Sequence, residues 1–276
     1  MNIEKIVCNF QQRYYPVGEN VDCLVEATKP ERKEILNIAC YGGYAVGLIV
    51  NGAESVTSID VSEQAIQNSK IIKKSIELGT YKFWKNILNI GVNEILFKKI
   101  SDSEDLSLSQ VDNYFVRLQA ELGLYWESDI IKEIFESFYP HTKSGEDFMK
   151  VKRKIKQNKW QIQKAELLGF LKTQPENSYD AICSSSVRNF VLFRADCKDI
   201  ETKYSSEEEF WEKEYNQPLF KEIYRCLRKN GRYVEAIIPR SVWGFEQKPF
   251  PENIKDKFKI ETIKQGQSEY HVAIKK

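Results

Sequence analysis

The chain has 276 residues, and its 41 Lys and Arg against 40 Asp and Glu give a formal net charge of +1 at pH 7. This balance provides no overall field to attract nucleic acid or an acidic membrane, and the length allows a substantial core. The six cysteines include no C-x-x-C pair and there are only two histidines, which argues against a zinc site. The sequence shows no apolar run of membrane-spanning length and no signal-peptide pattern, so we expect a cytoplasmic protein.

A strand, a glycine turn, a helix and a second strand are predicted early in the chain. An apolar run at 35–39 enters a turn at 41–43, a helical stretch covers 44–50, and a second strand covers 55–59. Asp60 follows directly, at the carboxyl end of that strand. In open α/β sheets, ligands bind at the carboxyl ends of strands, where glycine lets the backbone approach closely. Because an acid placed there can accept hydrogen bonds from both hydroxyls of a ribose, the segment predicts a nucleoside-cofactor site.

The glycine pattern of this turn distinguishes among nucleoside cofactors. A dinucleotide site calls for G-x-G-x-x-G, but the corresponding positions are Ala39, Tyr41 and Gly43, and Tyr41 would crowd a pyrophosphate. The turn instead resembles motif I of the class I S-adenosylmethionine (SAM) dependent methyltransferases, with Asn37 where that family often has an acid. A tight turn without a ligand is the alternative, and a nicotinamide dinucleotide is less favoured than either.

The elements that follow fit the order of that family. Ser62 as N-cap and Gly79 as stop delimit a predicted helix over 63–78. Strands are predicted at 160–164 and 179–184, and serines end the second of them. The long segment between the helix and these strands is charged and carries four amphipathic helical pieces, at 82–88, 109–124, 129–138 and 146–157.

The C-terminal part is predicted to complete the sheet. A helix is expected over 207–228, bent at its proline and closed by a cationic last turn before Gly231. Strand five covers 232–238, and the segments 258–264 and 269–274 can form an antiparallel pair. A closing hairpin of this kind distinguishes the SAM-binding fold from the dinucleotide Rossmann fold.

The resemblance implies an α/β fold, with a Rossmann-like class I methyltransferase sheet, a closing antiparallel hairpin and a helical insertion after strand two. We expect residues 1–34 to form an N-terminal segment that covers the cofactor site. Residues 35–79 and 159–276 would form the SAM-binding core. Residues 80–158 would form a helical cap, since a structureless loop of that length is implausible in a compact domain.

The same resemblance assigns the cofactor-binding residues. Asp60 would bind the ribose, the glycine pair would let the chain pass the cofactor, and the loop that carries Glu166 would meet the adenine. Structural roles are the alternatives: helix capping for Asp60, a plain turn for the glycines, and simple packing for Tyr41. The predicted SAM-binding residues are Asn37, Ala39, Tyr41, Gly42, Gly43, Asp60, Val61, Ala165, Glu166, Leu167 and Ser184.

The reacting centre is less defined by the sequence. Ser185, Tyr125 and Trp126 are candidates for the acceptor site, because they follow strand four or combine an apolar body with a polar handle in the insertion. Candidates for proton transfer or anion binding are Tyr14, Tyr15, His141 and Arg188, with a surface-loop histidine and a solvated arginine as the alternatives for the last two. We expect a small molecule or a lipid headgroup as acceptor. Nucleic acid is disfavoured, because strand four ends in serines rather than in an Asn/Asp-Pro-Pro-aromatic tip.

Two alternatives to methyl transfer remain. Residues 13–130 are similar in order to the 3-amino-3-carboxypropyl transferases of betaine-lipid synthesis, through Arg13-Tyr14-Tyr15-Pro16, Asp60-Val61-Ser62, the stretch 81–91, Arg117-Leu118 and Tyr125-Trp126. Those enzymes use SAM as an alkyl donor, so the pose of the cofactor would decide which group is transferred. A SAM-binding protein without turnover is the third possibility.

Overall fold

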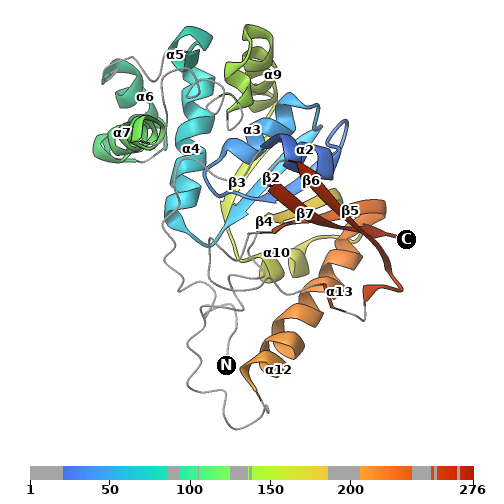
Figure 1. Cartoon of the computed structure of the whole chain (residues 1–276). Helices are drawn as coiled ribbons and strands as arrows, with labels where there is room; N and C mark the ends of the chain where they lie inside the picture. Colours follow the sequence, from blue (N-terminus) through green and yellow to red (C-terminus); the bar gives the residue numbers. More distant parts are fainter. Residues whose placement is uncertain are drawn as a thin grey trace.

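The computed structural model describes residues 21–85, 94–104, 106–124, 136, 139–185, 206–237, 250–251, 254–265 and 268–276. Within these ranges the strands form one seven-stranded sheet in the order β3-β2-β1-β4-β5-β7-β6 (Figure 1). The strands are β1 (Glu34–Ile38), β2 (Ser55–Asp60), β3 (Trp160–Lys164), β4 (Tyr179–Ser185), β5 (Leu227–Ile237), β6 (Phe258–Gln265) and β7 (Ser268–Lys275).

The direction of the strands confirms the predicted fold class. β1 runs parallel to β2 and β4, β3 runs parallel to β2, and β5 runs parallel to β4. β7 is antiparallel to both of its neighbours, β5 and β6, and lies between them. The first five strands therefore end at one edge of the sheet, and the closing hairpin lies beside β5.

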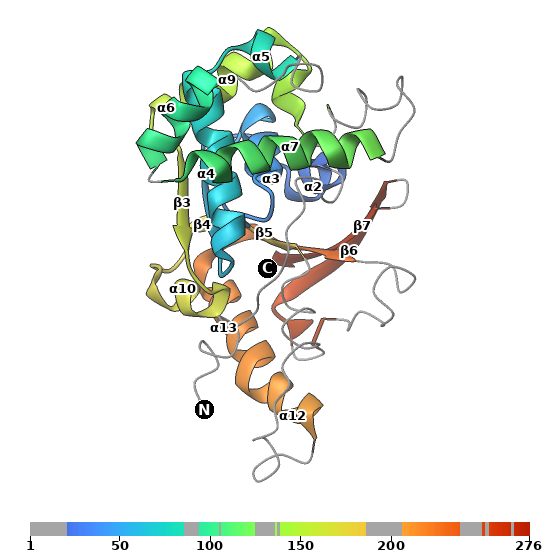
Figure 2. The same cartoon turned by 90° about the vertical axis from the view of Figure 1, so that its left-hand side faces the viewer.

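Helices cover both faces of the sheet. Figures 1 and 2 show α2 (Val21–Thr28), α3 (Gly43–Val50) and α9 (Gly145–Lys156) on the side opposite α10 (Leu167–Thr173) and α13 (Gln217–Cys226). The apolar side chains of both layers are buried against the strands and form one continuous core. None of the helices in the described part of the chain combines the length and apolarity needed to cross a membrane.

Helix α4 (Glu63–Leu78) has the predicted bounds because its ends carry specific signals. The hydroxyl of Ser62 accepts a hydrogen bond from the Ala65 amide and caps the first turn. At the other end, a Cβ on Gly79 would lie 2.3 Å from the Ser75 carbonyl oxygen, so this position requires glycine. Sequence signals at both termini therefore fixed the length of this helix.

The region between α4 and β3 is helical, as predicted, but its pieces differ from those expected. α7 (Leu108–Leu124) and α9 match two of the predicted helices closely. α5 (Tyr81–Lys85) covers the described part of the expected helix 82–88, and residues 86–88 lie outside the described residues. α6 (Glu94–Glu104) was not predicted, because only three of its side chains are buried and the rest of its sequence, apart from the exposed Ile95, is charged or polar. The predicted helix 129–138 lies outside the described residues, except for residue 136.

The predicted helix over 207–228 is divided into three pieces. α12 (Glu207–Trp211) passes through a π-helical turn (Glu212–Asn216) into α13. The expected bend at the proline is thus accompanied by a widened turn just before it, because Pro218 has no amide proton for a normal helical bond.

The expectation that residues 228–231 form the last turn of that helix is wrong. α13 ends at Cys226, and β5 begins at Leu227, which is fully buried and pairs with Tyr179 of β4. The guanidinium of Arg228 donates to the Asp180 carboxylate at 2.7 Å instead of capping helical carbonyls. Within residues 228–231, the residue with a left-handed backbone is Asn230, whose φ is 62°. Burial of Leu227 and its pairing with β4 therefore determine where the helix ends, rather than the helix-stop pattern at 228–231.

Candidate functional site

The turn between β1 and α3 has a backbone that only a small set of residues tolerates. Cys40 has φ of 47° and Gly42 has φ of 88°, both in the left-handed region. The Gly42 amide donates to the Ala39 carbonyl at 2.8 Å and closes the turn. A Cβ on Gly42 would lie 2.7 Å from Cδ1 of Ile72 on α4, so glycine is required here both for its φ and for its size. The turn is thereby pressed against α4.

Asp60 joins this turn to the end of β2. Its carboxylate accepts the Cys40 amide at 3.2 Å through Oδ2 and the Ser62 amide at 3.0 Å through Oδ1. The side chain is buried, and the N-cap of α4 is supplied by Ser62 rather than by Asp60. These two backbone bonds fix the orientation of the carboxylate. The glycine turn and the acid at the tip of β2 thus form one unit.

The loop after β3 lies beside the same acid. The Ala165 amide donates to the Asp60 carbonyl oxygen at 3.0 Å, and Leu167 is buried as the first residue of α10. Glu166 caps α10, because its carboxylate accepts the Leu168 amide at 2.9 Å and the Gly169 amide at 2.6 Å. The loop is therefore next to the Asp60 tip, but the Glu166 side chain is directed to its own helix.

Glu166 also has a partner that the sequence did not indicate. The Tyr215 hydroxyl, on the π-helical turn, donates to Oε1 of Glu166 at 3.2 Å. Burial, together with the neighbouring carboxylate, raises the pKa of Tyr215 well above its usual range, so the phenol stays protonated and remains a donor. This bond ties the loop after β3 to the segment before α13.

Asn37 lies inside the sheet. Its Oδ1 accepts the Ser58 hydroxyl at 2.8 Å, and the Ser58 oxygen accepts the Trp160 indole N–H at 3.0 Å. Its Nδ2 donates to the Ile38 carbonyl at 2.8 Å. The three side chains belong to β1, β2 and β3, so the network joins neighbouring strands. Asn37 is thus built into the sheet just before the turn.

Tyr41 is packed into a cluster of buried tyrosines. Its ring meets that of Tyr44 edge-on at 5.0 Å and that of Tyr139 at 5.8 Å between centroids. The hydroxyls of Tyr139 and Tyr114 are hydrogen-bonded at 3.0 Å, and burial raises the pKa of Tyr114. We call these four residues, Tyr41, Tyr44, Tyr114 and Tyr139, the tyrosine cluster. It connects the glycine turn to α7 and to the 3-10 helix Pro140–Thr142.

His141 is fully buried, so its interpretation as a surface-loop histidine is wrong. Its ring lies 4.5 Å from the Trp84 ring between centroids, and neither ring nitrogen has a hydrogen-bond partner among the described residues. Burial lowers the pKa of His141 to about 3. A group with so low a pKa is a weak proton acceptor near neutral pH. Its nearest ring neighbour, Trp84, is 57 residues away in sequence, so the burial of His141 gave no local signal.

The tips of β4 and β5 carry a polar pair that the sequence reasoning only half identified. Ser184 is buried, and its hydroxyl is hydrogen-bonded to that of Tyr233 at 2.7 Å. Ser185 is the last residue of β4 and lies opposite Glu235 in the register, and Glu235 is fully buried. A carboxylate within the apolar strand Tyr-Val-Glu-Ala-Ile was a usable signal for Glu235, because acids are rarely buried without a partner.

The remaining candidates are placed as follows. Gly43 is the first residue of α3, and Val61 connects Asp60 to the Ser62 cap. Outside the described residues lie Tyr14, Tyr15, Tyr125, Trp126 and Arg188.

The strand order and the antiparallel hairpin are those of one known fold. The fold is that of the class I methyltransferases. No family model matches the sequence, and no curated protein matches it.

Many solved structures match the chain at low identity. The rRNA methyltransferase aviRa of Streptomyces viridochromogenes is 10% identical, with a TM-score of 0.45, over 98% of this chain and 89% of that one. A SAM-dependent methyltransferase of Methanosarcina mazei is 12% identical, with a TM-score of 0.40, over 91% and 96%. Precorrin 8w decarboxylase of Methanobacterium thermoautotrophicum is 9% identical, with a TM-score of 0.41, over 96% of both chains. Because these scores are below 0.5, the fold assignment rests on the sheet itself.

Proposed function

We propose that this protein is a SAM-dependent transferase, and specifically a methyltransferase that acts on a small molecule or a lipid headgroup. The observation that carries the proposal is the Asp60 carboxylate at the tip of β2. The amides of Cys40 and Ser62 hold this buried carboxylate in place beside the glycine turn. A fixed acceptor at the carboxyl end of a central parallel strand suits the paired hydroxyls of a ribose.

The residues around this acid suit an adenosyl ligand. Asp60 would accept hydrogen bonds from the ribose, and the turn at 40–43 would pass close to the rest of the cofactor. Because the Glu166 carboxylate is bonded to the amides of α10 and to Tyr215, we assign the adenine contact to the backbone at 165–167. Asn37, Ala39, Tyr41 and Val61 would then support the site through the sheet and the turn.

The chemistry requires little of the protein beyond positioning. SAM, when bound, supplies an electrophilic carbon next to a sulfonium, which is already an activated leaving group. The chain would hold the acceptor in line with that carbon and exclude water. Ser184 at the tip of β4, with Tyr233 and Glu235 on the neighbouring strand β5, would provide hydroxyl and carboxylate groups for binding an acceptor.

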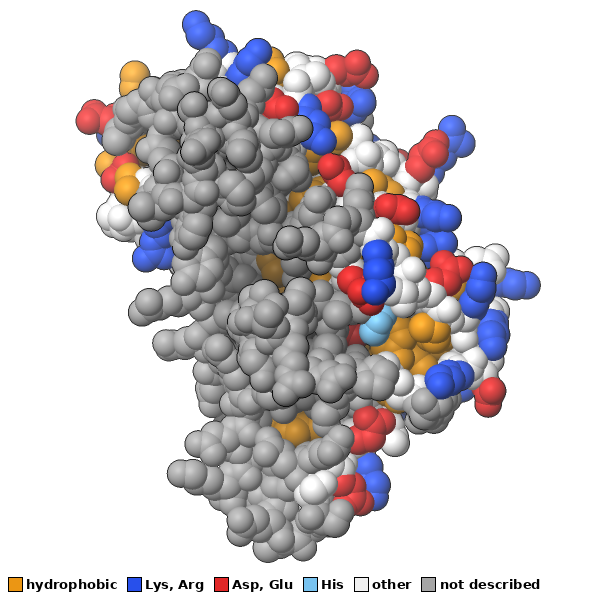
Figure 3. All heavy atoms as spheres, viewed as in Figure 1, with side chains coloured by type: hydrophobic (Ala, Val, Ile, Leu, Met, Phe, Trp, Pro, Cys, Tyr) orange, Lys and Arg blue, Asp and Glu red, His pale blue; other side chains and the backbone are white. Residues whose placement is uncertain are grey.

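The charge distribution favours a small acceptor over nucleic acid. On the face seen in Figure 3, basic and acidic side chains of the described residues are interspersed. The basic helix α9 is also partly neutralised, because Lys150 pairs with Asp147 at 3.1 Å and Lys154 pairs with Glu54 at 2.9 Å. Nucleic-acid-binding surfaces instead carry an uncompensated basic stripe.

We further propose that residues 80–158 act as a cap over one side of the core. The tyrosine cluster supports this role, because it packs Tyr114 and Tyr139 of this segment against Tyr41 of the glycine turn. The segment 1–34, of which α2 is described, would cover the cofactor from the other side.

Mass spectrometry of the by-product tests the proposed reaction. The protein is incubated with SAM and a small-molecule and lipid extract of cells, with Asp60→Asn protein as the matched control. Methyl transfer yields S-adenosylhomocysteine, and the control should yield far less. Methylthioadenosine would contradict methyl transfer and indicate 3-amino-3-carboxypropyl transfer. SAM binding without either by-product would indicate a protein that binds the cofactor without turnover.

A further inference from the structure

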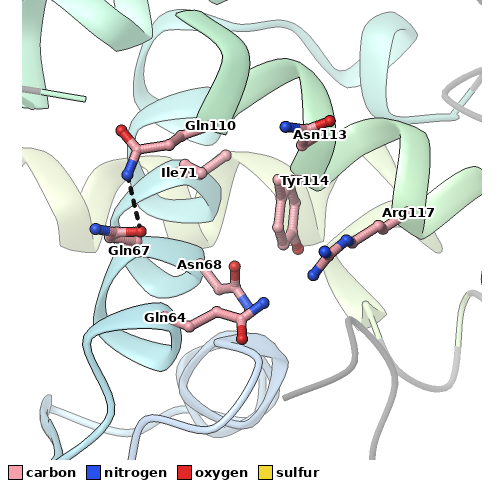
Figure 4. A pocket seen from close by; sticks show the side chains of 8 residues that line it. All are labelled: Gln64, Gln67, Asn68, Ile71, Gln110, Asn113, Tyr114 and Arg117. Atoms are coloured by element: carbon pink, nitrogen blue, oxygen red, sulfur yellow. Dashed lines mark hydrogen bonds between the residues drawn. The ribbon is translucent and has the colours of Figure 1, made fainter. Parts of the chain in front are cut away.

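A cavity of about 270 Å³ lies between α4 and α7, on the side of α4 that faces the helical insertion. Figure 4 shows that the side chains of both helices converge on it. Five carboxamides and one guanidinium line it: Gln64, Gln67, Asn68, Gln110, Asn113 and Arg117. No carboxylate is among the lining residues that the structure describes. This composition is unusual for a helix–helix contact, where apolar side chains normally interdigitate.

The most informative residue in the cavity is Asn68. It is only 7% exposed, and its carboxamide points into the cavity in Figure 4. Within the described part of the chain, no hydrogen bond is formed by this side chain, whereas Gln110 donates to Gln67 across the two helices at 3.1 Å. A carboxamide that faces a cavity in this way is hydrogen-bonded by water or by a ligand. A polar ligand in the cavity would supply the missing partner.

Arg117 adds a positive charge to the same space. Figure 4 shows its guanidinium directed from α7 toward the Asn68 side chain. Among the described residues, no ion pair is formed by Arg117, whereas Lys74 on the neighbouring helix α4 pairs with Glu77 at 2.7 Å. A planar guanidinium is well suited to bind a carboxylate or a phosphate group through two parallel hydrogen bonds.

The wall of the cavity is rigid. Tyr114 lines it, and the Tyr114 hydroxyl is held by that of Tyr139 in the tyrosine cluster. Ile71, on α4, is buried at the back of the same space. A cavity with fixed apolar walls and converging polar groups is the usual form of a small-molecule site, and this volume suits a compact ligand.

We propose that the cavity between α4 and α7 binds a small molecule that carries an oxyanion and an amide-like group. The oxyanion, a carboxylate or a phosphate, is bound by Arg117. The amide-like group exchanges hydrogen bonds with Asn68 and Gln64, because a carboxamide offers both donors and an acceptor. The site lies between α4 and α7 and is additional to the proposed SAM site at the tip of β2.

Three matched probes test the proposal on the full-length protein without SAM. Succinamate carries a carboxylate and an amide, 3-phosphonopropanamide carries a phosphonate and the same amide, and succinamide is the neutral counterpart. Binding is followed by the ¹H–¹⁵N signals of the side-chain amides. We expect at least one anionic probe to shift the Asn68 and Gln64 signals and to bind more tightly than succinamide, and the better of the two identifies the oxyanion.

Two variants and a control make the outcome decisive. Arg117→Gln should weaken the anionic probe about tenfold, as expected for one lost charge-assisted interaction, and leave succinamide unchanged. Asn68→Leu should weaken all three probes. Arg153→Gln is the control, because Arg153 is exposed on α9 and donates to the Met149 carbonyl within its own helix. The proposal is overturned if no probe shifts the Asn68 signal, as for a cavity that holds water alone, or if Arg117→Gln and Arg153→Gln bind the anionic probes equally well. Because SAM is absent, neither result bears on the transferase proposal.

Discussion

Asp60 and Cys40 are 20 residues apart in sequence, yet the carboxylate of one accepts the backbone amide of the other. The position of Asp60 could be predicted, because an acid directly after an apolar strand must lie at the strand's tip. Its bonding partners could not, because backbone amides carry no sequence signal. The left-handed φ of Cys40 could not be predicted either, because glycine is the residue type that indicates such a conformation in a sequence.

Glu166 illustrates the same limit and allows a prediction. Its carboxylate accepts two amides of α10 and the Tyr215 hydroxyl, so Glu166→Ala leaves three donors without their acceptor. We expect a loss of about 2 kcal/mol in the free energy of unfolding, measured with urea. Glu176→Ala, at an exposed position nearby, serves as the control and should lose almost nothing. Equal losses in the two variants would show that the cap contributes little.

His141 predicts a specific dependence of stability on pH. Burial lowers its pKa from 6.5 to about 3 in the folded state, so below pH 6.5 the unfolded chain binds a proton that the folded chain does not. Stability is therefore full above pH 6.5 and falls as the pH drops from 6.5 toward 3, by about 1.4 kcal/mol per pH unit from this group. His141→Phe keeps a ring against Trp84 but cannot titrate.

Urea unfolding of both proteins at pH 7, 6, 5 and 4 measures this effect. The difference in free energy of unfolding between the variant and the wild-type chain should shift in favour of the variant as the pH falls. A difference that stays constant over this range would mean that His141 is accessible to protons in the folded state.

At the scale of elements, the tyrosine cluster links α7 to the 3-10 helix that follows it. Tyr114→Phe leaves the buried Tyr139 hydroxyl without this partner, and Tyr139→Phe does the converse. Each single variant should lose about 1–2 kcal/mol, and the double variant should lose less than the sum. A double-mutant cycle of unfolding free energies measures the coupling. Strictly additive losses would contradict an energetic link between these elements.

Elements with two terminal signals were predicted well, and elements placed by tertiary contacts were not. Ser62 and Gly79 gave α4 its bounds. The start of β5 was predicted too late, because burial of Leu227 against the sheet is a tertiary effect that a helix-stop pattern does not report. α6 was not predicted for a similar reason. Its three buried side chains are covered by the neighbouring helices α4 and α7, and this packing is a tertiary contact.

At the scale of the whole molecule, the hairpin β6–β7 is part of the same sheet as the proposed site. Val272 is fully buried in β7, between Val234 of β5 and Glu261 of β6. Val272→Ala should lower the free energy of unfolding by about 2 kcal/mol through the cavity it leaves. Because β7 pairs with β5, tryptophan fluorescence and circular dichroism should report the same shifted midpoint. Two separate transitions would show that the hairpin unfolds independently.

The strands of the sheet and its closing hairpin were predictable, because the antiparallel pair shows as two apolar segments near the end of the sequence and the five earlier strands show as apolar runs before turns. Their order in the sheet was implied only by the resemblance to a known fold. The side-chain cluster at the tips of β4 and β5 was only partly predictable. Ser184 was identified from its position at the end of β4. Tyr233 and Glu235 lie within an apolar strand, and the pairing of β5 with β4 brings them to this tip.

The central claim is that Asp60, oriented by the glycine turn, holds an adenosyl cofactor. Isothermal titration calorimetry with SAM tests it most directly, on the wild-type chain, Asp60→Asn and Asp180→Asn. Asp180 is the matched control, because it accepts the Glu34 amide at 2.9 Å near the start of β4, at the opposite edge of the sheet. We predict that the wild-type chain and Asp180→Asn bind SAM with equal affinity, and that Asp60→Asn binds it about tenfold or more weakly, as for the loss of charge-assisted hydrogen bonds. No heat of binding in the wild-type chain, or equal affinity in all three proteins, would contradict the account.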